Sequence, residues 1–186
     1  MTSPDGGRDS VRLRPVCDAD MRLLWEWAND ASVRATAFHP EPIPWERHVQ
    51  WFTARRGDSG CRMHIITDEA GSPLGQLRID VHGESAEVHL SVAAPHRGQG
   101  IGAAALREAC ALMSTLAPAA IVVARVRPEN AASLRAFEKV GFIQRGVEVV
   151  NGRSAIRLVR SSARANDPVV REDGHGVGYS TNLRRE

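Results

Sequence analysis

Long apolar runs are missing from this chain of 186 residues. No stretch reaches 18 consecutive apolar residues, so the sequence predicts neither a membrane-spanning helix nor a membrane partner. The segment Met1–Ser10 is polar and lacks the apolar core of a signal peptide, from which we expect a cytoplasmic protein.

Cysteine is scarce, because the chain has three, Cys17, Cys61 and Cys110, at wide spacing. Without a Cys-x-x-Cys pair they predict reduced thiols and no bound metal. A large excess of one sign of charge is also lacking. The 24 basic and 22 acidic residues give a net charge of +2, and the basic residues form no dense tract. Nucleic acid is therefore not an expected partner.

The chain is nevertheless long and apolar enough for one domain with a buried core, with 42% hydrophobic residues. We expect that domain to span residues 11–160. A flexible leader, residues 1–10, precedes it, and a polar, Gly-rich and mobile tail, residues 161–186, follows it.

Hydrophobic periodicity and turn residues predict an α/β (α+β) fold with the order β-α-α-β-β-β-α-β-α-β-β. The predicted strands cover residues 11–14, 62–67, 73–81, 86–92, 119–126, 142–150 and 153–159. Asp18 or Asp20 is expected to cap the first helix, which ends near Asn29. The other predicted helices cover residues 45–56, 102–116 and 130–140.

A glycine-rich loop follows the strand that ends at Val92 and opens the next helix. Gly98, Gly100 and Gly102 permit positive φ angles and a close approach of the backbone to a ligand. The first amides of the helix have no partner inside it. Together with Arg97 and the positive end of the helix dipole, they favour a bound pyrophosphate.

Two other nucleotide-binding loops fit this segment less well. A dinucleotide-binding loop would need an acidic residue about 20 positions on, where Ala119–Val123 holds no carboxylate. A Walker loop would need Lys and then Ser or Thr after the last glycine, where Ala103 and Ala104 stand. A tight turn without a ligand is the third alternative.

Two segments resemble signatures of the GNAT superfamily of acyl-CoA N-acyltransferases. One is Arg97-Gly98-Gln99-Gly100-Ile101-Gly102, which matches the pattern Arg/Gln-x-x-Gly-x-Gly/Ala, and the other runs from Asn130 to Phe142. The resemblance covers Val11 to Arg160. It implies the GNAT fold, a central mixed and mostly antiparallel sheet of about seven strands flanked by four helices. It also implies acetyl-CoA as co-substrate, no metal, and the homodimer that is frequent among relatives.

The resemblance further implies how acetyl-CoA is held. The loop from Arg97 to Gly102 would bind the pyrophosphate, and the pantetheine arm would lie along the backbone of Leu90 and Val92, where the fourth and fifth strands diverge. Asn130 would bond the same arm, with Ser133 one turn further on the same face. A helix cap is the other interpretation of Asn130.

Attack of an amine on a thioester needs a base that takes the amine proton. Glu87 and His89 lie two apart on the fourth strand and so share a face. Relatives often use a carboxylate or a histidine on this strand, and an imidazole suits this work at neutral pH. Glu87 would need a raised pKa, or would act through ordered water. The alternative is that both are ordinary exposed strand positions.

One position departs from the family pattern. The family commonly has a Tyr four residues after the position of Ser133, which protonates the leaving thiolate, and Phe137 stands there. The single tyrosine, Tyr179, lies in the predicted tail. Water can supply the proton, because a simple thiol has a pKa of about 8.5. The other interpretation is a catalytically weak acyl-CoA-binding module.

All four tryptophans precede Phe52, in the region that usually forms the acceptor side in this family. Core packing is one interpretation of this cluster, and contact with a flat acceptor ring is the other. The expected acceptor-binding residues are aromatic or polar: Trp25, Asn29, Arg34, Trp45 and His48. For Arg34, a contact with a nucleotide diphosphate and a plain surface charge are both open.

The same region is similar to GNAT enzymes that acetylate UDP-linked 4-amino sugars of pseudaminic-type sialic acid biosynthesis. The predicted function is acetyl transfer to the primary amine of a small molecule, best an amino sugar or nucleotide-linked amino sugar, in a ternary complex. Aminoglycoside acetyltransferases and enzymes that acetylate the N-terminus of ribosomal proteins share a similar run and stay alternatives.

Overall fold

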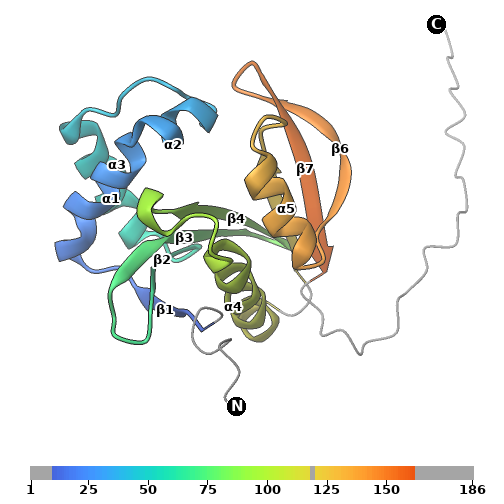
Figure 1. Ribbon diagram of the computed structural model, residues 1–186, viewed down its shortest axis with the longest axis horizontal. Coiled ribbons are helices and arrows are strands. Elements are labelled where there is room, and N and C mark those ends of the chain that lie inside the picture. The colour runs from blue at the N-terminus through green and yellow to red at the C-terminus, as the bar shows by residue number, and fades with distance from the viewer. Residues whose placement is uncertain (1–9, 118–119, 162–186) are drawn as a thin grey trace, which may run out of the picture.

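The structure is a computed structural model in which residues 10–117 and 120–161 are described. They form one seven-stranded sheet with helices packed against it (Figure 1). The strands are β1 (Arg12–Pro15), β2 (Cys61–Thr67), β3 (Pro73–His82), β4 (Ser85–Val92), β5 (Ile121–Val126), β6 (Ile143–Val150) and β7 (Arg153–Ser161). The α-helices are α1 (Met21–Asn29), α2 (Ala31–Thr36), α3 (Trp45–Gly57), α4 (Ile101–Leu116) and α5 (Ala131–Lys139). Two short 3-10 helices, η1 (Asp18–Asp20) and η2 (Ala94–His96), precede α1 and α4.

The strand order is β1-β2-β3-β4-β5-β7-β6, and every pair is antiparallel except β4 with β5. The parallel pairing of β4 with β5 is short and ends where Glu87 faces Val123. From Val88 to Val92, β4 keeps β3 as its partner on one side, and no described strand pairs with it on the other. Backbone N–H and C=O groups along this half of β4 are therefore available to a ligand.

The core lies on both faces of the sheet. Ile65 and Ile66 are neighbours on β2 and so point to opposite faces, and they lie in different hydrophobic clusters. The larger cluster includes Leu77 and packs α4 and α5 against the sheet. The smaller one packs α1 and α3 on the other face through Leu24 and Phe52. In Figure 1, α1, α2 and α3 lie together near β1–β3, and α5 lies with β6 and β7 at the opposite end.

The expected fold class is confirmed, with seven strands in a mixed and mostly antiparallel sheet. The expected helix count is one short, because α2 lies between the first two predicted helices. Asp30 starts this helix by accepting hydrogen bonds from the amides of Ser32 and Val33. With six residues and no buried side chain, α2 carries no apolar stripe that periodicity could reveal.

The carboxylate expected to cap the first helix has a different role. Asp20 accepts a hydrogen bond from the Cys17 amide at 2.8 Å and two from the Arg14 guanidinium at 2.8 and 2.9 Å. It therefore fastens β1 to the start of the helical region and caps no amide of α1. The bonds from Arg14 lower the pKa of Asp20 to about 2.

Some predictions concern residues outside the described ranges. These are the leader up to residue 9, the start of a strand at residue 119, and the tail from residue 162, with Tyr179. No described helix combines the length and the apolar character that crossing a membrane requires.

Candidate active site

The glycine-rich loop presents a row of free amides at the start of α4. The N–H groups of residues 98–103 donate no hydrogen bond within the described part of the chain, and the first helical bond runs from Ala104 to Gly100. Gly98 and Gly100 have φ angles of 74° and 82°, which a side chain would strain. The amide of Arg97 is not part of this row, because it donates to a carbonyl of η2 at 3.4 Å. Such amides at the positive end of a 16-residue helix favour an anion.

This loop borders a cavity of about 810 Å³, which we call the cofactor cavity. Leu90 and Val92 line it from the unpaired half of β4, and Asn130 and Ser133 line it from the start of α5. Several basic side chains surround it: His96, Arg97, Arg127, Arg135 and Lys139. Free amides, open strand backbone and these cations suit a long anionic molecule of the coenzyme A type.

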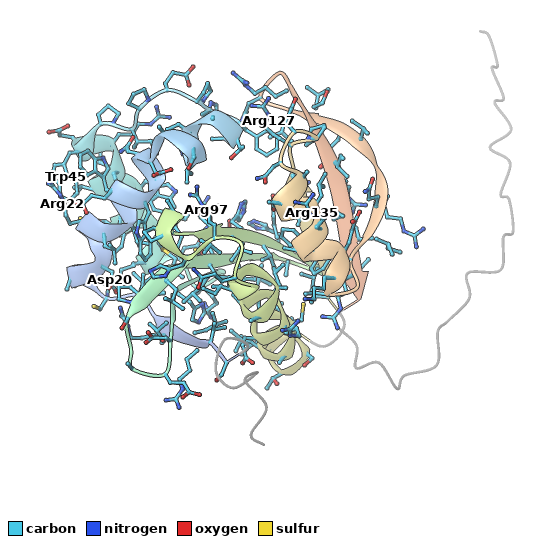
Figure 2. The ribbon with its side chains drawn as sticks, in the orientation of Figure 1. Asp20, Arg22, Trp45, Arg97, Arg127 and Arg135 are labelled. Atoms are coloured by element: carbon cyan, nitrogen blue, oxygen red, sulfur yellow. The ribbon has the colours of Figure 1, made fainter. Side chains whose placement is uncertain are left out.

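Arginines on two sides of the cofactor cavity hold α2 in place. Arg97 donates through Nε to the Val92 carbonyl at 2.9 Å, and its other end bonds Ser32 and lies 3.6 Å from Asp30. Arg127 donates to the carbonyl of Ala35 at 3.2 Å. Figure 2 shows Arg97 near the loop and Arg127 and Arg135 on the side of α5. The helix that the sequence did not reveal thus bridges the two sides of the cavity.

Not every expected loop residue faces the cofactor cavity. The Gln99 amide folds back onto the Pro95 carbonyl at 3.2 Å, and Gln99 does not line the cavity. Ile101 and Gly102 do line it. A Cβ added at Gly102 would lie 3.5 Å from a Leu90 methyl group, an ordinary contact. Alanine therefore fits at position 102, whereas position 100 requires glycine.

At the start of α5, Asn130 accepts a hydrogen bond from the Ser133 amide at 3.1 Å, so it caps the helix. Phe137 is 2% exposed and meets Phe142 edge-on, with ring centroids 4.9 Å apart. Although Phe137 also lines the cofactor cavity, its ring has no proton to donate.

A second cavity of about 650 Å³, the acceptor cavity, lies between the sheet and the region of α1–α3. Phe38, Pro42, Trp51 and Met63 contribute apolar surface to it. Its wall and that of the cofactor cavity have five residues in common: Ala37, Phe38, His89, Leu90 and Ser91. The two cavities therefore meet at the unpaired half of β4.

His89 stands at this junction, and a carboxylate that the sequence did not reveal accompanies it. The register between β3 and β4 sets Arg78 opposite His89 and Asp80 opposite Glu87. The Nε2 atom of His89 lies 3.3 Å from Asp80 Oδ2 and 3.8 Å from Glu87 Oε1. A proton on Nε2 that is donated to Asp80 leaves Nδ1 as the basic atom of the ring.

Asp80 is 5% exposed and remains ionised. Burial would raise its pKa, but hydrogen bonds and charges from His89 and Arg78 outweigh burial and hold the pKa well below its usual range. Arg78 donates to it at 2.9 Å. Burial also raises the pKa of the Cys61 thiol to about 12, and its bond to Asp80 adds to this. A charge in the alternating strand Leu77–Val81 was the signal that could have identified Asp80.

Glu87, the other expected base, is engaged elsewhere. Its carboxylate forms an ion pair with Arg125 at 2.6 Å, and Arg125 also bonds Glu148 of β6. Glu87 lines neither cavity. The structure thus brings one of the two expected bases to the junction and uses the other to connect β4, β5 and β6.

Three of the expected acceptor-binding residues lie away from the acceptor cavity. Trp25 donates from its indole to the Ile43 carbonyl at 2.8 Å, and Asn29 binds the same backbone through both its amide atoms. Trp45 meets Trp25 edge-on at 5.6 Å, and Arg22 covers both rings. Figure 2 shows Arg22 and Trp45 side by side at the outer edge. These residues hold the proline-rich connection because its free backbone groups need partners.

Arg34 and His48 do line the acceptor cavity. His48 is 2% exposed and donates through Nε2 to the Met21 carbonyl at 3.0 Å. Burial lowers its pKa, so it is a neutral part of the wall. Arg34 donates to the His39 carbonyl at 3.0 Å, and its Nε is buried with no hydrogen-bond partner within the described residues.

Among the described residues, no group of three His, Cys, Asp or Glu side chains is placed to hold a metal ion. None of the three cysteines forms a disulfide within the described residues; Cys17 is exposed, and Cys61 and Cys110 are buried.

Residues 10–143 match the family model for the acetyltransferase (GNAT) domain, which is more than half of the chain. The protein therefore belongs to the GNAT acetyltransferase family. It is an acetyl-CoA-dependent N-acetyltransferase, with acetyl-CoA as its co-substrate.

Solved structures show the same fold. The spermidine N-acetyltransferase from Vibrio cholerae, in complex with CoA and spermine, is 20% identical with a TM-score of 0.71, over 81% of this chain and 94% of that one. The aminoglycoside acetyltransferase AAC(6')-Ib, in complex with ribostamycin and coenzyme A, is 20% identical with a TM-score of 0.71, over 82% of this chain and 93% of that one. No curated protein matches the chain.

Proposed function

We propose that the protein transfers the acetyl group of acetyl-CoA to the primary amine of a small molecule, with His89 as general base and Asp80 as its positioning residue. The observation that carries this proposal is the meeting of two cavities at one titratable side chain. The cofactor cavity and the acceptor cavity both reach His89. A thioester carbonyl and an attacking amine that enter from opposite sides would meet beside this imidazole.

Acetyl-CoA supplies an activated thioester, whose C–S bond breaks as the C–N bond to the amine forms. Nδ1 of His89 takes the proton that the amine loses, and Asp80 stabilises the resulting imidazolium across 3.3 Å. The CoA thiolate leaves and takes a proton from water, because the Phe137 ring offers none.

The residues proposed for the co-substrate divide into three groups. The amides of Gly98, Gln99, Gly100, Ile101 and Gly102 bind the pyrophosphate. Leu90 and the amide of Val92 offer backbone groups to the pantetheine arm, because no described strand pairs with them on that side, whereas the Val92 carbonyl already accepts a hydrogen bond from Arg97. Asn130 and Ser133 contribute from α5. Arg97 acts mainly by fixing the loop to α2, since its guanidinium is already bonded there.

Two observations indicate the class of acceptor: the residues that line the acceptor cavity and the names of the fold relatives. The two relatives described above are named for spermidine and for aminoglycosides, which favours the aminoglycoside alternative over a nucleotide-linked amino sugar. Trp25, Asn29 and Trp45 bind other parts of the chain and give no support to an aromatic platform for a sugar. On the names of the relatives alone, an aminoglycoside is the second candidate acceptor, and the basic side chains of the cavity wall weigh against it.

An acetyl-transfer assay on an amine panel tests the proposal. The full chain is incubated with acetyl-CoA and, separately, with spermidine, ribostamycin, a UDP-linked amino sugar, small amino acids and a short peptide with a free N-terminus. Release of free thiol reports turnover. The proposal predicts turnover with at least one small amine. Turnover with the peptide alone, or acetyl-CoA binding without any turnover, would overturn it.

A further inference from the structure

The wall of the acceptor cavity carries more basic than acidic side chains, although the acceptor is an amine. Its wall carries the arginines Arg34, Arg47 and Arg78 and a single carboxylate, Glu41. A polyamine or an aminoglycoside carries several positive charges, so these arginines would repel it. The wall therefore selects against the acceptors for which the fold relatives are named.

Two of the three arginines lack an ion pair with a described residue, so their charge is available to a ligand. Arg78 is committed, because it pairs with Asp80 at 2.9 Å and lies over the Trp51 ring at 5.5 Å. Arg34 and Arg47 form no ion pair with any described residue. Arg34 lies partly buried with a buried, unpartnered Nε, and a guanidinium in this state favours a carboxylate or phosphate as partner.

The electrostatic state of Arg34 agrees with this. Burial lowers its pKa, and the charge of Glu41 opposes part of that effect without an ion pair to it among the described residues. The guanidinium nevertheless stays protonated, since arginine does not lose its proton in proteins. A partly buried positive charge that Glu41 opposes only from a distance is incompletely compensated, and an anionic ligand would complete the compensation.

We infer that the acceptor is an amine that also carries an acidic group, a carboxylate or a phosphate, which Arg34 binds with help from Arg47. The inference rests on the proposed function, because it names the substrate class of the same site. In the transfer step the amine end of this molecule attacks the thioester beside His89, while its acidic end stays on the arginines and is chemically unchanged. Binding at both ends orients the nitrogen for attack.

Four short amines of similar length test the inference. They differ in the charge of the end that carries no reacting amine: 3-aminopropanoate and phosphoethanolamine have an acidic group there, 3-amino-1-propanol a neutral one and 1,3-diaminopropane a cationic one. Spermidine and ribostamycin are measured beside them. We expect kcat/KM to be about 10- to 100-fold higher for an acidic amine than for the alcohol or the diamine. Comparing the rates of 3-aminopropanoate and phosphoethanolamine shows whether the site prefers a carboxylate or a phosphate. Equal rates, or a preference for the diamine, spermidine or ribostamycin, would contradict the inference.

Variants assign the preference to Arg34. Arg34→Gln should reduce kcat/KM for the preferred acidic amine about 10- to 100-fold and for the alcohol far less, and Arg34→Lys should restore part of the loss. Arg22→Gln is the matched control, because Arg22 lies on α1 outside both cavities. An equal loss for acidic and neutral amines in Arg34→Gln would sink the assignment.

Failure of the inference and failure of the proposed function give different results. If amines are acetylated without a preference for acidic ones, the inference fails and the proposed function stands. If acetyl-CoA binds but no amine in either panel is acetylated, both fail, and the chain is an acyl-CoA-binding module.

Discussion

Among single residues, His89 has the most direct role in the proposed transfer step. It lines both cavities, and Asp80 lies 3.3 Å from its Nε2 atom. We expect His89→Ala to lower kcat by about 10²- to 10⁴-fold, the usual contribution of a general base, while acetyl-CoA binds nearly as before. His82→Ala is the matched control, because this exposed histidine ends β3 away from both cavities. A wild-type rate in His89→Ala would remove it from the mechanism.

The role of Asp80 is visible in the two kinetic constants. Its carboxylate lies 3.3 Å from Nε2 of His89, where it orients the ring for its work as a base. We expect Asp80→Asn to lower kcat by about 10-fold or more, while KM for acetyl-CoA stays near wild type. A kcat per folded molecule equal to that of wild type would make Asp80 purely structural.

Residue identities alone predicted the local geometry of the glycine-rich loop better than that of the junction around His89. The loop residues from Gly98 to Gly102 and the start of α5 are local in sequence, and their geometry follows from short-range rules of turns and helix ends. Asp80 acquires its role from strand pairing, which sets it opposite Glu87 and beside His89. The roles proposed for Trp25 and Asn29 depended on where the proline-rich connection runs, which no local pattern determines.

At the scale of elements, the start of α4 is the part most sensitive to substitution. Gly100 has a φ of 82°, so a Cβ there costs about 1–2 kcal/mol and displaces the amides that follow. Gly102 has no positive φ, and a Cβ there meets side chains at 3.5 Å or more. We expect Gly100→Ala to weaken CoA binding by about 5- to 30-fold and Gly102→Ala to leave it near wild type.

Calorimetric titration with CoA compares these two variants directly. The same added methyl group at two neighbouring glycines separates backbone strain from bulk. If both variants bind CoA equally well, the left-handed turn at Gly100 is not what shapes the binding loop.

Element prediction from the sequence was accurate where periodicity was strong and failed where it was weak. The strands and the long helices α3 and α4 lie within one or two residues of their predicted bounds. The helix α2 was missed because it is short and buries no side chain. It is nonetheless functionally placed, since Arg97 and Arg127 bind it from two sides of the cofactor cavity.

At the scale of the whole molecule, the sheet is what joins the two cavities. Pairing between β4 and β5 stops after Glu87, so one half of β4 holds the fold together and the other half is open to ligands. The ion pair of Glu87 with Arg125 lies where the pairing ends. The sequence suggested this divergence through family resemblance, and the strand register shows where it begins.

Acid stability of the molecule should depend on Asp20. Its pKa falls from 3.8 to about 2 on folding, so it stabilises the native state above about pH 4, and this contribution is lost as the pH falls through 2. After allowance for the exposed side of Arg14, we expect about 1–2 kcal/mol at neutral pH. Thermal unfolding of wild type and Asp20→Asn should therefore differ at pH 7 and converge only below about pH 2. A constant difference across this range would contradict the ion pair.

The free amides of residues 98–103 are the groups that we propose bind acetyl-CoA. Hydrogen–deuterium exchange, resolved by peptide, measures how fast these amide hydrogens exchange with and without saturating acetyl-CoA. We expect fast exchange in the free protein, because these groups have no partner among the described residues. Once acetyl-CoA is added, we expect strong protection. Unchanged exchange in this loop while acetyl-CoA is demonstrably bound would place the co-substrate elsewhere and contradict the account.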